Sequence, residues 1–321
     1  MQRVFTCVVL ATLAVIYCGC GATNGVKNQI KVDTTQRPRA KDATKEELLE
    51  KYNNIAQNVK SLTSTVQLKP TAGSKYSGVI DEYHEVKAFL LAERPEKIRV
   101  IGQAPVIGTT VFDMASDGTT FHVSIPSKNK FLVGPVAVER TSNKPIENLR
   151  PQHLVDALLW NQVRKQEAVL FEEFNDEIGR YYVLTVLRGG YQTEILRKIW
   201  FDRSNLQISR LQTFGPKGVL LSDVHVSDWQ PLDSTSPTGT PATAASPNTP
   251  ATSSAVTSFP HAIRIERPHD DYRLDLLIQK VTLNEEIPAA RFKLEQPPGA
   301  ELIRVSDDSE EKKPVKDSSK P

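Results

Sequence analysis

One short stretch near the N-terminus has residue types and spacing that fit a covalent modification. An apolar run from Val4 to Tyr17 ends at Cys18-Gly19-Cys20-Gly21, which places two thiols beside small residues. The third cysteine, Cys7, lies inside the apolar run. Because every cysteine belongs to this leader, the rest of the chain cannot form a disulfide, and Cys20 is a candidate for chemistry of its own.

Side chains that carry catalysis are scattered over the rest of the sequence. The chain has no His-x-x-x-His pair, no Cys/His metal spacing and no Gly-x-Ser-x-Gly or Gly-Lys-Ser/Thr loop. The paired acids Glu172-Glu173 and Asp270-Asp271 fit solvated strand and turn positions, since neighbours in a strand point to opposite faces. We therefore expect no enzymatic activity, no metal and no cofactor, and a hydrolase assembled from scattered carboxylates is the alternative. The six histidines are His84, His122, His153, His225, His261 and His269.

The leader is typical of an exported protein. Its apolar run is shorter than the roughly 20 residues that a membrane-spanning helix needs, and Arg3 precedes it. Gly19-Cys20 resembles the lipobox of bacterial lipoproteins, which implies a signal peptide over residues 1–19 and lipidation of Cys20. Tyr17 stands where that motif has Leu or Val, so Cys18 and an ordinary cleaved signal peptide remain alternatives.

Lipidation would hold the chain on a membrane. Two or more acyl chains give stable anchoring, and Gly21 after the cysteine resembles the sorting signal for the outer membrane, with the protein facing the periplasm. Residues 20–43 are polar and are expected to form a flexible tether, and residues 306–321 a disordered tail. Lys and Arg number 40 against 38 Asp and Glu, so we expect no nucleic-acid partner.

The remaining sequence, residues 44–305, is expected to form one α+β domain. Thr44 and Glu47 predict a capping box at the start of a helix, and Pro151 predicts the start of a second helix. Most other segments are short, rich in β-branched and aromatic residues, and bounded by Pro, Gly or Asp. We predict about eleven strands in a large, curled antiparallel sheet with two or three covering helices. Residues 231–260 are almost all Ser, Thr, Pro, Ala and Gly, and are expected to form a low-complexity insert between two strands.

One predicted loop has an unusual composition. Pro105, Val106 and Ile107 lie between two glycines at a chain reversal, where polar residues are usual. A loop tip buries little of itself, so these residues either tuck under the sheet or are offered to something outside the protein.

The segment 107–112 and the order of elements around it resemble the LolA/LolB superfamily of bacterial lipoprotein carriers, and its LolB-like, lipid-anchored branch in particular. The resemblance implies a half-open barrel with helices as a lid over an apolar cavity. The implied partners are acyl chains of lipoproteins or lipids, the outer membrane and a soluble periplasmic carrier. Residues 105–107 would form the loop for acyl transfer or membrane contact. Candidates to line the cavity are Phe89, Leu91, Ile98, Val100, Phe112, Trp160 and Trp200.

Two functions follow from this resemblance. The chain is either a receptor that accepts lipoprotein acyl chains and inserts them into the membrane, or a passive lipid-binding, sensory or structural lipoprotein with the same fold. Strand periodicity does not decide which face of the sheet lines a cavity, because both faces of the segment from Val86 to Leu91 are apolar. Each cavity candidate has plain core packing as its alternative.

Overall fold

The computed structural model describes residues 38–74, 79–136, 150–190, 193–232 and 256–305. Residues Ala40–Pro321 group into one compact unit, and the description below concerns its described residues. Two α-helices lie in this part, α2 (Lys45–Asn58) and α3 (Pro151–Leu158), together with three short 3-10 turns, η1 (Pro126–Lys128), η3 (Pro216–Gly218) and η4 (Ala289–Phe292). No described helix has the length and apolar character to cross a membrane.

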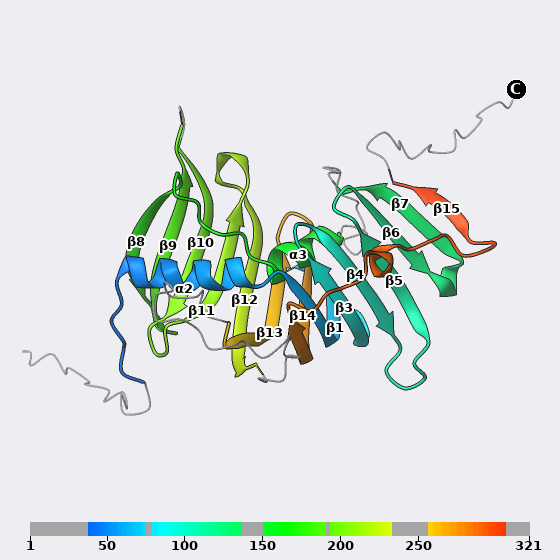
Figure 1. Ribbon diagram of the computed structural model, residues 1–321, viewed down its shortest axis with the longest axis horizontal. Helices are drawn as coiled ribbons and strands as arrows, with labels where there is room; N and C mark the ends of the chain where they lie inside the picture. Colours follow the sequence, from blue (N-terminus) through cyan, green and yellow to red (C-terminus); the bar gives the residue numbers. More distant parts are fainter. Residues whose placement is uncertain (1–37, 75–78, 137–149, 191–192, 233–255, 306–321) are drawn as a thin grey trace, which may run out of the picture. The chain divides into compact units, whose positions relative to one another are not determined.

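The strands of the described chain join in a single sheet (Figure 1). Its order is β15-β7-β6-β5-β4-β3-β1-β14-β13-β12-β11-β10-β9-β8, and β2 pairs with the far end of β1. All pairs are antiparallel except β15 with β7. The strands are β1 (Ser61–Ser74), β2 (Val79–Glu82), β3 (Val86–Glu93), β4 (Lys97–Gln103), β5 (Thr110–Ser116), β6 (Thr120–Ile125), β7 (Lys130–Pro135), β8 (Ala168–Asn175), β9 (Arg180–Arg188), β10 (Glu194–Asp202), β11 (Gln207–Phe214), β12 (Leu220–Pro231), β13 (Ser258–Arg267), β14 (Tyr272–Leu283) and β15 (Glu301–Arg304).

The predicted number of about eleven strands is too low, since the described residues form fifteen. Pro70 suggests a turn but lies inside β1, at the point where the neighbour of β1 on one side changes from β3 to β2. The backbone of Pro70 faces the junction between β3 and β2, where its carbonyl accepts from Tyr83 N at 3.1 Å, so its missing amide does not interrupt the ladder with β14. After β14 the chain forms η4 and later returns to the sheet as β15.

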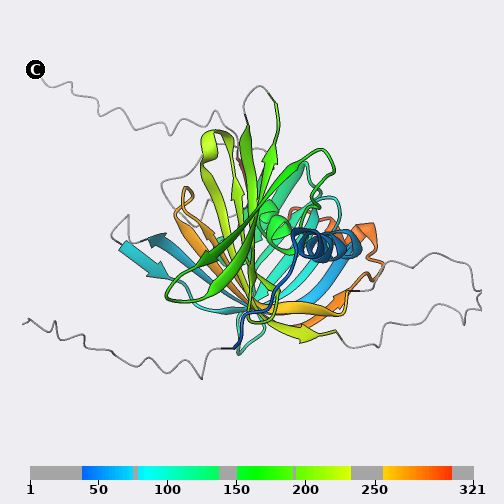
Figure 2. The ribbon, with the colours of Figure 1, turned by 90° about the vertical axis from the view of Figure 1, so that its left-hand side faces the viewer.

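The two helices cover one face of the sheet, which we call the inner face. Figure 2 shows the strands fanned around them on a concave side. The capping box of α2 forms as expected, because Thr44 N donates to Glu47 Oε2 at 2.8 Å and Glu47 N donates to Thr44 Oγ1 at 3.3 Å. One side of α2 is buried against the inner face through Leu48, Tyr52, Ile55 and Ala56.

The insert expected at residues 231–260 joins two neighbouring strands. β12 extends to Pro231 and β13 begins at Ser258, and these two residues are register partners. Leu232 N also donates to Thr257 O at 3.0 Å. The described ends of the insert therefore lie side by side.

Deleting residues 234–255 should change the free energy of unfolding by less than about 1 kcal/mol. Loop closure costs only about 0.6 kcal/mol per doubling of loop length, and the two strand ends already pair. Urea denaturation of the deletion, compared with a Gly/Ser replacement of equal length, measures this. A loss of several kcal/mol in both proteins would show that the natural segment packs on the unit.

Candidate functional site

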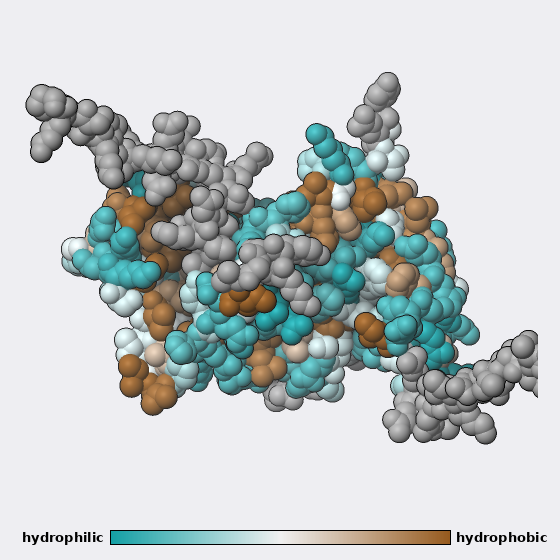
Figure 3. All heavy atoms as spheres, turned by 180° about the vertical axis from the view of Figure 1, so that it is seen from behind, coloured by the Kyte–Doolittle hydropathy of each residue, from teal (hydrophilic) through white to brown (hydrophobic). Residues whose placement is uncertain are grey.

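The loop between β4 and β5 presents an apolar tip to solvent. Val106 is 95% exposed and Ile107 is 76% exposed. The loop closes through two backbone bonds, from Ala104 N to Thr109 O at 2.9 Å and from Gly108 N to Ala104 O at 3.0 Å. The sequence allowed these residues either to tuck under the sheet or to point outward. In the structure, Val106 and Ile107 point outward. Figure 3 shows the hairpin end as an apolar tip at the lower left.

Two glycines shape this hairpin. Gly108 has a φ of 66°, a left-handed conformation that glycine adopts without steric cost. At the base of the hairpin the ring of Phe112 lies directly against Gly102, where an added Cβ would come within 2.3 Å of the ring. Phe112 is therefore held against the inner face, where it packs on the core.

Three further cavity candidates lie together in the inner core. Ile98 and Val100 are fully buried on β4, and Trp160 follows α3 and is 4% exposed. The Trp160 ring stacks on Tyr52 of α2 at 6.1 Å and meets Trp229 of β12 edge-on at 6.2 Å. These side chains fill the space between helices and sheet.

The other cavity candidates occupy the opposite face, which we call the outer face. Phe89 is 40% exposed there, beneath the Lys87 ammonium. Leu91 is buried with Ile287 and Phe292 of the segment after β14. Trp200 contacts the rings of Phe174 and Tyr181 and the guanidinium of Arg210. Side chains alternate between the two faces of a sheet, so Phe89, Leu91 and Trp200 cannot line one cavity with Ile98 and Val100. The prediction that all of these residues line a single cavity is therefore wrong.

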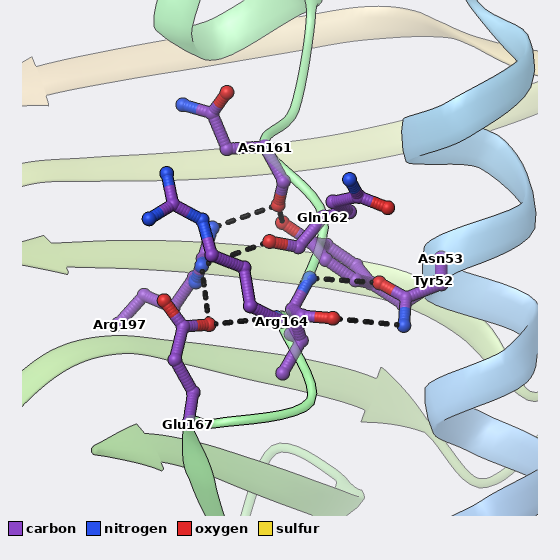
Figure 4. A network of polar contacts seen from close by, with 8 residues as sticks. Tyr52, Asn53, Asn161, Gln162, Arg164, Glu167 and Arg197 are labelled. Atoms are coloured by element: carbon purple, nitrogen blue, oxygen red, sulfur yellow. Dashed lines mark hydrogen bonds and ion pairs between the residues drawn. The ribbon is translucent and has the colours of Figure 1, made fainter. Parts of the chain in front are cut away.

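A segment that we call the strap, residues 159–167 between α3 and β8, closes over the inner face. Tyr52 Oη donates to Asn161 O at 2.8 Å, and Asn53 exchanges two bonds with the backbone of Val163 at 2.8 and 3.3 Å. Figure 4 shows this network between α2 and the strap. From the sheet, Arg197 donates to Asn161 O at 2.7 Å and pairs with Glu167 at 3.1 Å. The strap is thus tied to both layers.

Arg94, in the turn between β3 and β4, holds the C-terminal end of α2. Its guanidinium donates to Val59 O at 2.9 Å, Ala56 O at 2.8 Å and Trp160 O at 2.6 Å. A cation at a helix C-terminus satisfies carbonyls that lack helical partners. This role cannot be predicted from the sequence, because all three acceptors are backbone atoms of distant segments and leave no side-chain pattern.

The two clearest hollows of the described chain both have open mouths. One, of about 360 Å³, lies between the turn after β10 and the end of β12, and is lined by Asn205, Ile208 and Trp229 among others. The second, of about 440 Å³, lies mainly on the outer face around Lys69, Arg264 and Leu277. Neither of these two hollows lies between α2 and the centre of the inner face.

His153 of α3 is a buried histidine whose pKa is lowered strongly. Its Nδ1 forms a hydrogen bond with the hydroxyl of Tyr272 on β14. Burial, and to a smaller extent the charges of Arg267 and Arg150, lower the pKa of His153 from 6.5 to about 2. Among the residues that the structure describes, no three His, Cys, Asp or Glu side chains gather as a metal site.

The depressed pKa of His153 predicts acid sensitivity. Below pH 6.5 the imidazole of His153 is protonated in the unfolded chain but stays neutral in the folded chain. The free energy of unfolding is therefore highest above pH 6.5 and decreases as the pH falls below 6.5. The slope for one proton is at most about 1.4 kcal/mol per pH unit. Denaturation between pH 7 and 4.5 should show a shallower fall for His153→Gln than for the natural protein. His84→Gln, at an exposed position, is the control, and equal slopes for all three would contradict the role of His153.

No known protein family matches the sequence, and no curated protein matches it. Several solved structures align with the chain over most of its length. A LolA superfamily protein from Nitrosomonas europaea has 15% identity and a TM-score of 0.44, over 79% of this chain and 99% of that chain. A DUF1329 family protein from Desulfovibrio piger has 13% identity and a TM-score of 0.44, over 76% and 94%. An outer membrane lipoprotein-sorting protein domain from Vibrio parahaemolyticus has 10% identity and a TM-score of 0.44, over 76% and 95%.

Proposed function

We propose that this chain is a lipid-anchored lipoprotein of the outer membrane that binds acyl chains and passes them to the membrane, as a LolB-like receptor does. The observation that carries the proposal is the apolar tip of the β4–β5 loop, where Val106 and Ile107 are exposed on a closed, hydrogen-bonded turn. Large exposed apolar groups at such a tip favour contact with an apolar phase outside the protein. The concave inner face with its covering helices supplies the acyl-binding surface.

Transfer would need no energy source. Each site in the sequence has only to bind the acyl chain somewhat better than the previous site, and apolar contacts supply such differences. The packed inner core implies that acyl binding and displacement of α3 or the strap occur together. The tip residues would make the first contact with lipid.

A transfer assay tests the proposal. A soluble carrier loaded with an acylated lipoprotein is mixed with the chain and with liposomes, and lipoprotein in the liposome fraction is measured over time. The proposal predicts that the lipoprotein passes through the chain into liposomes. Acceptance without release would favour the second function, a passive lipid-binding or sensory lipoprotein. The close packing of Tyr52, Trp160 and Trp229 between the helices and the sheet favours the structural form of that alternative.

Cys20→Ala should release the chain from the membrane without unfolding it. Cys20 lies outside the described residues, and the described unit contains no cysteine on which its fold could depend. Fractionation of cells should find the Cys20→Ala variant in the periplasm rather than in the membrane. Cys18→Ala is the matched control and should stay in the membrane. Membrane association that persists in Cys20→Ala and disappears in Cys18→Ala would place the anchor at Cys18.

A further inference from the structure

Among the strands that the structure describes, β8 forms one edge of the sheet. It is the terminal strand of the described sheet order, beyond β9, and is the outermost strand at the left of Figure 1. All eight residues of β8 pair with β9 without a register shift. Every second residue of such an edge turns its backbone N–H and C=O away from the sheet, ready to pair with another strand.

This edge lacks the features that usually prevent pairing. Edge strands are normally short, bulged, or interrupted by Pro or Lys. The opposite edge, β15, has only four residues, whereas β8 has eight, with no bulge, Pro or Lys. Several of its apolar side chains are exposed, with Leu170 at 58%, Phe171 at 39% and Phe174 at 43%.

An added strand would meet apolar surface on both faces. On the outer face, Phe174 packs edge-on against Trp200 at 5.2 Å. On the inner face, Phe171 lies against Tyr182 at 5.1 Å. Side chains of an incoming strand would alternate between these two aromatic surfaces.

The charge of the edge selects the kind of partner. Residues 168–179 contain four acids and no Lys or Arg: Glu172 and Glu173 lie on β8, and Asp176 and Glu177 follow it. Glu173 already forms an ion pair with Arg203, so on β8 itself the acid offered to a partner strand is Glu172. A second copy pairing β8 antiparallel to itself would bring these acids together, which is unfavourable. An incoming strand with basic residues would instead find complementary charge.

We propose that β8 is a docking edge for an extended segment of another protein, in which apolar residues alternate with Lys or Arg, and which adds to the sheet as a further strand. This site is separate from the β4–β5 loop, which lies in the other half of the strand order. The proposal does not depend on acyl transfer.

The test uses the full chain in mild detergent with a synthetic ten-residue peptide that alternates valine and lysine. Fluorescence anisotropy of the labelled peptide gives affinity, and amide hydrogen exchange shows where it binds. We expect saturable binding with slowed exchange in residues 168–175, and at least tenfold weaker binding for a valine/glutamate peptide. Leu170→Lys combined with Phe174→Lys should weaken binding of the basic peptide at least tenfold. Ile80→Lys, at a 52% exposed residue of β2, should not change it.

Four results would overturn the proposal. These are equal binding of both peptides, binding without protection of β8, β8 amides already protected in the free monomer, and a dimer whose β8 amides are protected without peptide. The third would show that another segment of this chain covers the edge, and the fourth that a second copy does. Circular dichroism of the double variant shows whether it folds, and if it does not, the single change Glu172→Lys replaces it, with the same expected loss of affinity for the basic peptide.

Discussion

Ile107→Glu should abolish delivery of lipoprotein to liposomes while leaving the protein folded. Ile107 is 76% exposed, and surface substitutions usually change the free energy of unfolding by about 0.5 kcal/mol or less. A carboxylate loses its hydration when it enters an apolar phase, which is strongly unfavourable. The transfer assay should therefore show a large loss of rate, and thermal denaturation should show almost no change.

Ile178→Glu is the matched control for this change. Ile178 is 87% exposed at the turn between β8 and β9, so it adds the same charge to an equally open apolar position. Transfer by this variant should equal that of the natural chain. If Ile107→Glu transfers normally, the loop is not the contact with lipid, and if it unfolds, the loop packs against the rest of the protein.

Arg94→Ala should destabilise the protein by at least about 3 kcal/mol. The change removes three hydrogen bonds from a charged donor, each with a typical contribution of about 1.5–3 kcal/mol, and leaves partly buried carbonyls without a donor. Urea denaturation measures the loss. Arg94→Lys keeps the charge, but one ammonium group cannot reach all three acceptors. The stability of Arg94→Lys should therefore lie between that of the natural protein and that of Arg94→Ala.

Arg188→Ala is the control for Arg94→Ala. Arg188 forms an ion pair with Glu194 at 2.6 Å, but its side chain is 63% exposed, and surface ion pairs contribute little. We expect a loss below about 1 kcal/mol for this variant. Equal losses for Arg94→Ala and Arg188→Ala would mean that the turn, α2 and the strap do not depend on the Arg94 guanidinium.

Local signals in the sequence were sufficient for the helices and for most hairpins. The Thr44 and Glu47 side chains form the expected capping box, and α3 begins at Pro151, since both features depend only on neighbours in sequence. The extension of β1 through Pro70 could not be predicted, because it depends on β14, more than 200 residues away. Where the partner strand is distant, the proline alone predicts a turn.

The candidate site was predictable only in part. The apolar loop at Val106 and Ile107 was visible from composition. The sequence did not predict that Phe89 and Leu91 lie on one face of the sheet and Ile98 and Val100 on the other. Both faces of the strand carry apolar residues, so its pattern does not show which face the helices cover. Leu91 is buried on the outer face by a segment some 200 residues later in the chain, which no periodicity within β3 could indicate.

Native mass spectrometry of the Cys20→Ala chain, purified from the periplasm, tests the central claim most directly. The anchor is removed by using Cys20→Ala, so that any lipid observed is bound by the fold itself. The account predicts a diacyl lipid or acylated peptide bound at about one per chain, which is lost when the protein is denatured. A chain that is free of lipid, and that stays free after incubation with excess phospholipid and acylated peptide, would contradict it.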